Sequence, residues 1–366
     1  EKAVITGDTV RLSAYTIGEN AIGALASALG DAPVAVITGE KSWAAAGPRL
    51  PGLKICAYIP YGGACTMETI ARTAQAATQA GAGAVLGVGG GRALDAAKAA
   101  AQSLGLPVYA VPTIAATCAA VTALSIVYHA DGRLDRFIFS DEPPRQAFID
   151  TALLAAAPSR YFRAGMLDAM AKHLECTFAM RGDEVGYADS LGRAISETIF
   201  DPLLRTGAQA YRDCLSGRAT PVVADALQRV IVSTGNTSLL ISEQYNGAVA
   251  HSVCYGLGAL PGVEARALHG ELVGYGCLVQ LALDGDAKRL AALRAFLQEV
   301  GAPIRLADMG VAFEEAALAT VITETLAGPD MRKLPYPVTD SMLLAAMAQV
   351  ERMAPTPVPD AELAKV

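Results

Sequence analysis

The sequence has no C-x-x-C pair, no run of basic residues and no apolar stretch long enough to cross a bilayer. Its seven cysteines are odd in number and scattered, which argues against a disulfide framework or a thiolate zinc site and favours a reducing cytoplasm. Acidic residues outnumber basic ones by 36 to 29, so we expect no nucleic-acid partner. The interrupted apolar runs predict no membrane partner either.

What is present indicates a large folded protein. The 366 residues correspond to two domains at about 150 residues each. Because 52% of the residues are hydrophobic and only 18% are charged, the chain can bury a sizeable core. An intrinsically disordered chain is thereby excluded.

Strand and helix patterns alternate in the first part of the chain, and helical patterns alone fill the second. Short apolar strands are expected at 33–38, 54–59, 84–90, 107–113 and 146–150. A hairpin is expected over 122–140, with Asp131 and Gly132 at its turn. We therefore predict an α/β nucleotide-binding domain with a mostly parallel sheet over 1–155, and an all-α domain over 156–366.

A glycine-rich turn lies between a predicted strand and a predicted helix in VGGGRALDAAK, residues 88–98. Glycines let a phosphate approach the backbone, and the helix N-terminus then offers free N–H groups and the positive end of its dipole. The spacing matches neither G-x-G-x-x-G nor the P-loop pattern. A pyrophosphate cradle and a tight turn in which Asp95 satisfies first-turn amides therefore both fit these residues. Glu40, after an earlier strand, fits either a ribose contact or a solvated acid.

The chain has only four histidines, His129, His173, His251 and His269. His251 lies within a helical pattern and His269 at an expected helix start. Two neutral imidazoles and one carboxylate make a three-ligand metal site with an open position. Asp168 is the candidate carboxylate because an acid on a largely apolar helix needs a partner. The spacings form no short-range metal signature, so capped or core histidines and a surface acid remain the alternative. We interpret His129 and His173 as capped or core histidines.

The segments TGEK, YGGAC, GVGGGRALDAAKA, PVYAVPTIAAT, TALSIVY, AGMLDAMAK, AHSVCYGL and LHGELVGYG resemble, in this order, segments of the glycerol dehydrogenases. Those enzymes belong to the iron- or zinc-dependent alcohol dehydrogenase superfamily, which shares its fold with dehydroquinate synthase. The resemblance spans about residues 3–350. It implies an N-terminal domain that binds NAD, a helical domain that holds one divalent metal, an active site in the cleft between them, and a homo-oligomer.

The resemblance also assigns functional residues by position. It implies that Asp168, His251 and His269 are metal ligands and that Glu40 holds the adenine ribose. Together with Asp95 of the glycine turn, the other candidate cofactor-binding residues are Gly90, Gly91, Arg92, Thr113, Ala116, Thr122, Leu124 and Tyr128.

Three positions depart from the glycerol dehydrogenase pattern. Cys118 stands where the family has an aspartate that binds the polyol. Cys254 replaces a second histidine one turn after His251, and Lys172 stands where the iron-dependent branch has another histidine ligand. We therefore expect zinc in a three-ligand site rather than iron in a four-ligand site. The string PTIAATCAA also resembles a subgroup of reductases that act on 2-oxo and 2-hydroxy carboxylic acids.

These features predict reversible hydride transfer between NAD(H) and a small carbonyl/alcohol pair. Cys118 removes a negative charge and Lys172 can add a positive one, which favours a 2-oxo acid over a polyol. For Lys172, a surface lysine or an ion pair with Glu175 is the alternative. Glu40 would repel a 2′-phosphate and so favours NAD over NADP.

Other functions stay open at this point. The first is a glycerol or related diol dehydrogenase. A non-redox cyclase like dehydroquinate synthase is less supported, because its chemistry needs clusters of basic residues that the helical half lacks. A non-catalytic nucleotide-binding protein would not need the three candidate metal ligands.

Overall fold

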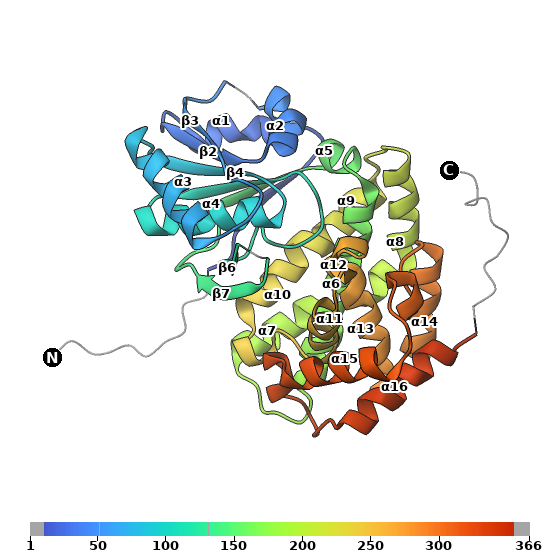
Figure 1. The fold of residues 1–366 in the computed structure, drawn as a ribbon. Helices are drawn as coiled ribbons and strands as arrows, with labels where there is room; N and C mark the ends of the chain where they lie inside the picture. Colours follow the sequence, from blue (N-terminus) through green and yellow to red (C-terminus); the bar gives the residue numbers. More distant parts are fainter. Residues whose placement is uncertain (1–10, 51, 131, 355–366) are drawn as a thin grey trace.

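The computed structural model describes residues 11–50, 52–130 and 132–354 (Figure 1). The first part of the chain forms a parallel sheet with helices packed against it, and the second part is helical. Figure 1 shows the sheet, in blue to green, beside the helical part, in green to red. This is the α/β plus all-α architecture that the sequence predicts.

Six parallel strands form the main sheet in the order β1-β8-β5-β4-β2-β3. The strands are β1 (Ala14–Gly18), β2 (Val34–Thr38), β3 (Ile55–Pro60), β4 (Ala84–Gly89), β5 (Val108–Pro112) and β8 (Gln146–Asp150). The central strands β2, β4 and β5 are buried along their whole length, because helices cover both faces of a parallel sheet. The five predicted strands are confirmed within one or two residues. The partly exposed edge strand β1 was not predicted.

A helix follows five of the six strands of the sheet. These helices are α1 (Leu25–Leu29), α2 (Glu40–Ala46), α3 (Met67–Gln79), α4 (Gly91–Leu104) and α5 (Thr151–Ala155). Helix α3 begins where the Thr66 hydroxyl accepts a hydrogen bond from the Thr69 amide at 3.1 Å. Helix α4 ends at Gly105, which adopts the left-handed conformation typical of a helix C-cap.

The predicted hairpin is present as two antiparallel strands, β6 (Leu124–Tyr128) and β7 (Leu134–Phe139). Of the two predicted turn residues, Gly132 has a φ of 88°, and Asp131 lies outside the described residues. Strand β6 packs against α4, so the hairpin lies beside the glycine turn.

The part of the chain after β8 is helical, and no strand occurs in it up to residue 354. Its helices are α6 (Ser159–Ala179), α7 (Tyr187–Ser196), α8 (Phe200–Leu215), α9 (Pro221–Leu227), α10 (Thr234–Leu240), α11 (Val249–Gly258), α12 (Val263–Arg266), α13 (His269–Leu283), α14 (Ala287–Glu299), α15 (Glu315–Ala327) and α16 (Asp340–Arg352). A π-helical segment, Gln228–Ser233, joins α9 to α10.

Two glycines of α13 let this helix approach its neighbours closely. A side-chain carbon at Gly270 would lie 2.0 Å from the carbonyl oxygen of Ala164 in α6. One at Gly276 would lie 2.3 Å from the carbonyl oxygen of Ala250 in α11. Helices α6, α11 and α13 therefore meet backbone to backbone, which only glycine permits at these crossings.

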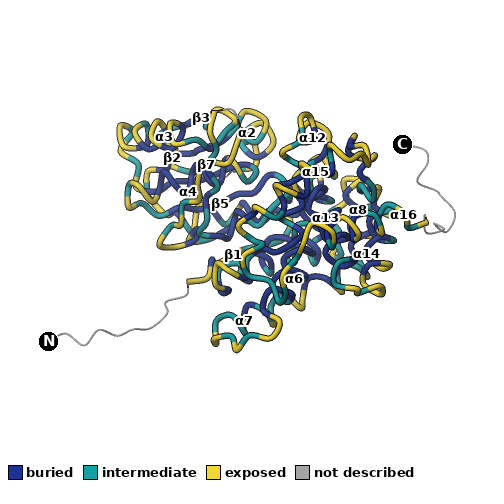
Figure 2. The backbone as a smooth tube through the Cα atoms, turned by 60° about the horizontal axis from the view of Figure 1, so that its bottom comes forward, coloured by how far each residue is buried: buried dark blue, intermediate teal, exposed yellow. Residues whose placement is uncertain are grey.

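Buried residues run through the central strands and through the interior of the helical part, while exposed residues gather at the periphery (Figure 2). Among the described helices, none combines the length and the apolar composition that a membrane span requires.

Candidate active site

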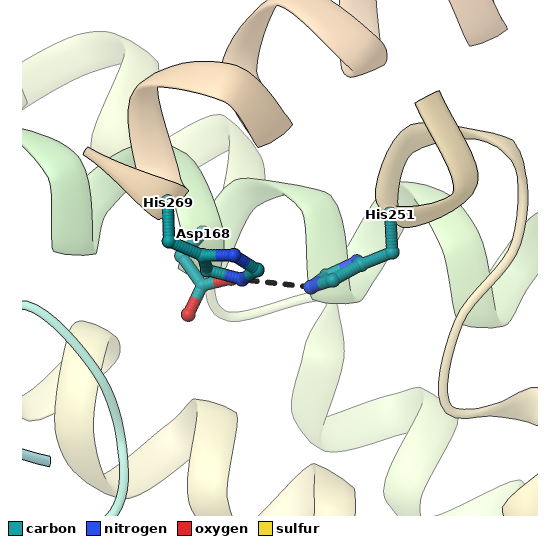
Figure 3. Close-up of side chains that lie close together, drawn as sticks. All are labelled: Asp168, His251 and His269. Atoms are coloured by element: carbon teal, nitrogen blue, oxygen red, sulfur yellow. Dashed lines mark ion pairs between the residues drawn. The ribbon is translucent and has the colours of Figure 1, made fainter. Parts of the chain in front are cut away.

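The three candidate metal ligands come together from three different helices (Figure 3). Asp168 lies within α6, His251 in the first turn of α11, and His269 is the first residue of α13. The Oδ1 atom of Asp168 lies 3.3 Å from Nε2 of His251 and 3.7 Å from Nε2 of His269. All three ligand atoms lie within 4.8 Å of one another.

These separations suit one small divalent cation. In a tetrahedral site with bonds of about 2.1 Å, neighbouring ligand atoms lie about 3.4 Å apart. The side chains of Asp168 and His251 are each 15% exposed, whereas that of His269 is 48% exposed. The cluster is therefore open on the side of His269, where a further ligand has access.

Two carboxylates make the field at this cluster negative. Burial lowers the pKa of His251, but the charge of Glu175 and hydrogen bonds to Asp168 and Glu175 outweigh it and raise the pKa to about 10. Burial raises the pKa of Asp168, yet the His251 hydrogen bond and the charges of His269 and His251 hold it below its ordinary value. Such a field favours a bound cation.

Glu175 is a site residue that the sequence suggests only as a partner of Lys172. It is fully buried, and its Oε2 lies 2.5 Å from Nδ1 of His251. It follows Asp168 by two turns of α6, so the two carboxylates share one helix face. The i, i+7 spacing in the sequence could have placed Glu175 on the same helix face as Asp168. It could not have shown the contact with His251, which depends on how α11 packs against α6.

Lys172 is neither a surface lysine nor an ion-pair partner of Glu175, so both parts of that alternative are wrong. It is buried, and its Nζ donates hydrogen bonds to the backbone oxygen of Asn246 at 2.6 Å and to Asn246 Oδ1 at 3.0 Å. Its positive charge helps to hold the pKa of Asp168 below its ordinary value, and it opposes the burial that raises the pKa of Cys118. The ammonium group therefore contributes to the electrostatics of the site.

Cys118 lies in the loop between β5 and β6, partly exposed. Burial, together with the negative charge of Asp168, raises the pKa of its thiol to about 11. The thiol is therefore neutral at physiological pH, which does not suit a nucleophile. The charge of Asp168 thus reaches this thiol.

Two glycines fix the loop that carries Cys118. A side-chain carbon at Gly165 in α6 would lie 1.9 Å from the carbonyl oxygen of Ala115. One at Gly235 in α10 would lie 2.1 Å from Val121 Cγ2 and 3.6 Å from Cys118 Cβ. The loop is therefore seated directly on the helical part, one turn from Asp168.

The predicted cofactor residues gather at the carboxyl ends of the central parallel strands. Glu40 is exposed at the start of α2, after β2. Gly90 is the N-cap of α4 and Gly91 its first residue, after β4. Thr113 follows β5, and its hydroxyl lies 3.3 Å from the Ser42 hydroxyl of α2. This edge is where open α/β sheets bind ligands.

Asp95 has internal partners rather than the first-turn amides considered from the sequence. Its Oδ1 lies 2.9 Å from Nζ of Lys98, and its Oδ2 accepts a hydrogen bond from the amide of Ile126 at 3.2 Å. Lys98 also donates to the hydroxyl of Thr122 at 3.2 Å and to the carbonyl of Leu124. This buried pair ties α4 to the loop and hairpin, and a direct role of Asp95 toward a cofactor remains a prediction.

The remaining candidates lie beside the same turn. The Arg92 guanidinium lies over the ring of Tyr128, 5.4 Å from its centroid, which suits a cation–π contact. Ala116 is partly buried in the loop before Cys118. The glycine turn and the hairpin thus form one surface.

The other two histidines lie outside the cluster, as predicted. His173 is buried, with its Nδ1 3.0 Å from the hydroxyl of Ser196. His129 is exposed at the end of β6, with its Nε2 3.8 Å from Asp135 Oδ1.

Comparisons with known proteins agree with this fold. The sequence pattern of the iron-containing alcohol dehydrogenase family matches residues 13–151. A glycerol dehydrogenase of Escherichia coli is 33% identical over 317 residues, covering 85% of this chain and 83% of that relative. Hydroxycarboxylate dehydrogenase A of Escherichia coli is 35% identical over 323 residues, covering 86% of this chain and 88% of that relative.

A solved structure shows the same relationship in three dimensions. The crystal structure of a probable glycerol dehydrogenase from Sinorhizobium meliloti superimposes with a TM-score of 0.84 at 26% identity. The match covers 94% of this chain and 98% of that one. The likeness in sequence and in fold thus defines the class of this protein as an oxidoreductase of the alcohol dehydrogenase type.

Within that class, the chain belongs to the iron-containing alcohol dehydrogenase family. The resemblance to glycerol dehydrogenases, inferred from eight sequence segments, is confirmed by these relatives. So is the resemblance to a hydroxycarboxylate subgroup, which was inferred from the string PTIAATCAA.

Proposed function

We propose that this protein transfers a hydride between NAD(H) and a small 2-oxo acid/2-hydroxy acid pair, with one zinc ion bound by Asp168, His251 and His269. The observation that carries the substrate assignment is the neutral thiol of Cys118 beside the charge of Lys172, next to Asp168. In this proposal residues 1–155 bind the cofactor and residues 156–366 hold the metal.

A cation at the cluster would supply a Lewis acid that polarises the substrate carbonyl. The three side chains offer two imidazole nitrogens and one carboxylate oxygen, a donor set that zinc accepts. The positions that would provide further ligands in the iron-dependent branch do not offer imidazoles here. Lys172 donates to Asn246 instead, and Cys254 lies outside the cluster. Both observations favour a three-ligand zinc site.

NAD would lie along the carboxyl edge of the sheet and carry the hydride. Helix α4 begins at this edge, and Gly90 and Gly91 leave the backbone amides of its first turn without side chains of their own, which suits a pyrophosphate. Glu40, exposed at the start of α2, would accept hydrogen bonds from the adenine ribose and repel a 2′-phosphate. The remaining contacts would come from Arg92, Asp95, Thr113, Ala116, Thr122, Leu124 and Tyr128.

Charge supports the choice of substrate. An aspartate at position 118 would repel a carboxylate, whereas a neutral thiol does not. Lys172 has three N–H donors, and the two hydrogen bonds to Asn246 leave one for another acceptor. A carboxylate bound near Cys118 would meet this ammonium group. The identity with hydroxycarboxylate dehydrogenase A supports the same substrate class.

The second candidate function is polyol oxidation. It is favoured by the name glycerol dehydrogenase, which several relatives carry. The two functions differ in the charge of the substrate, so a substitution that changes the charge at position 118 should distinguish them.

The test is a pair of assays on the wild type and on Cys118→Asp. We expect the wild type to reduce 2-oxo acids with NADH at a higher kcat/KM than it oxidises glycerol or diols with NAD. In Cys118→Asp, oxo-acid reduction should fall at least about tenfold and diol oxidation should rise, because one full charge is added beside the substrate. Cys118→Ser, which is neutral and of similar size, is the control. A wild type that prefers diols, or a Cys118→Asp enzyme with unchanged preference, would overturn the substrate assignment.

A further inference from the structure

We propose that Glu175 is a positioning residue of the metal centre, fixing both the ring of His251 and the backbone that carries it. This inference rests on the proposed metal-binding role of His251. It concerns a residue that donates no atom to the cluster of Asp168, His251 and His269.

One carboxylate makes all of these contacts. Oε1 of Glu175 accepts hydrogen bonds from the amides of Ala248 at 2.9 Å and of His251 at 2.8 Å. Oε2 lies 2.5 Å from Nδ1 of His251. The side chain is fully buried, so no water competes for these donors. Both oxygens of Glu175 are thus used on the segment that begins α11.

The contact at Nδ1 selects the tautomer of His251. Because Nδ1 donates its proton to Glu175, the proton that a bound metal would replace is the one on Nε2, which then offers its lone pair. That Nε2 is the atom that lies 3.3 Å from Asp168 Oδ1, within the ligand cluster. A carboxylate behind a metal-binding histidine orients the ring and strengthens it as a ligand.

The contacts with amides fix where α11 begins. Ala248 is the N-cap of α11 and has no side chain that can accept a hydrogen bond. Glu175 from α6 accepts from the amide of His251, and Gln280 from α13 accepts from the amide of Ala250 at 3.2 Å. Two neighbouring helices therefore cap α11, and the negative charge of Glu175 suits its N-terminus.

The second histidine has no such support. Nδ1 of His269 lies 3.4 Å from the sulfur of Cys254, a weak and neutral partner, and the side chain is half exposed. Of the two histidines, only His251 has both its ring and its backbone amide hydrogen-bonded to a buried carboxylate, that of Glu175. A buried carboxylate that only filled space would not need to face a histidine nitrogen and two amides at once.

The experiment measures metal affinity directly, without turnover. Metal-free wild type, Glu175→Gln and Asp213→Asn are titrated with Co²⁺, followed by visible absorption, and with Zn²⁺ against a chromophoric chelator. Asp213 is a buried acid in the helical part whose partners are Gln209, Arg218 and Thr220, so it controls for the loss of a buried charge. We expect Glu175→Gln to bind about 10- to 100-fold more weakly, with an altered Co²⁺ spectrum. Asp213→Asn should match the wild type.

Equal affinity and equal Co²⁺ spectra in Glu175→Gln and wild type would overturn the inference. A wild type that binds neither ion would instead contradict the proposed metal site. If Glu175→Gln does not fold, nitrogen NMR of the zinc-loaded wild type decides. We expect a protonated Nδ1 and a metal-bound Nε2 on His251, and the opposite assignment would overturn the role of Glu175.

Discussion

In the proposed function, the charge states of single side chains determine which substrate the site accepts. The thiol of Cys118 stays neutral because burial and the nearby Asp168 raise its pKa to about 11. Lys172, only 8% exposed, keeps its ammonium group on Asn246. A neutral position and a positive one thus lie beside the ligand cluster, where the glycerol dehydrogenase pattern has a negative one.

A buried histidine away from the site makes the stability of the protein depend on pH. Burial lowers the pKa of His173 to about 4, from 6.5 in an ordinary setting. Between these values the unfolded chain binds a proton at His173 that the folded protein does not bind. The free energy of unfolding should therefore fall as the pH falls from about 6.5 to about 4, by up to about 3 kcal/mol from this residue.

Urea unfolding of the wild type and of His173→Gln, measured at several pH values in this range, tests the prediction. Glutamine cannot take up the proton, so the stability of the variant should vary less steeply with pH. Parallel pH dependences in the two proteins would show that His173 does not titrate as its burial implies.

At the scale of elements, the site depends on how closely the loop before β6 approaches α6. Gly165 is the contact point, since any side chain there would collide with the carbonyl oxygen of Ala115. The same loop carries Cys118, and the same helix carries Asp168. The distance between the loop and the helix is therefore short because Gly165 has no side chain.

Gly165→Ala should push this loop away from α6. We expect a loss of kcat/KM of at least about tenfold and a lower melting temperature, even though alanine is the better helix former by about 1 kcal/mol. Gly258→Ala is a matched control, because its added carbon would meet only Glu264 Oε1, at 3.5 Å. A Gly165→Ala enzyme as stable and active as the wild type would contradict this account of the loop.

Elements with a clear period were predictable, and contacts between elements were not. The buried strands and α3 follow from apolar runs and their flanking turns, whereas β1, a partly exposed edge strand, has no such run.

The cluster of Asp168, His251 and His269 could be predicted because the chain has few histidines and because a family pattern gives their order. Glu175 was not found, because its partner His251 lies on another helix. The partners of Asp95 were not predicted for the same reason. Its carboxylate contacts Lys98 and the amide of Ile126 in the hairpin rather than the first-turn amides.

At the scale of the whole molecule, the proposed function needs both parts of the chain. The sheet edge with Glu40, Gly90 and Gly91 belongs to the α/β part, and the ligand cluster belongs to the helical part. The loop with Cys118 leaves the sheet at β5 and is seated on α6 and α10, so it joins the two. The central claim is that a cation in the helical part is required for the redox reaction.

The most direct test is NADH oxidation with a panel of 2-oxo acids and small carbonyls, before and after chelation. We expect chelation to abolish at least about 90% of the activity, because substrate polarisation would be lost, and one equivalent of zinc to restore it. Asp168→Asn, treated in the same way, should not recover. Full activity in protein whose metal content has been measured as negligible would contradict the account.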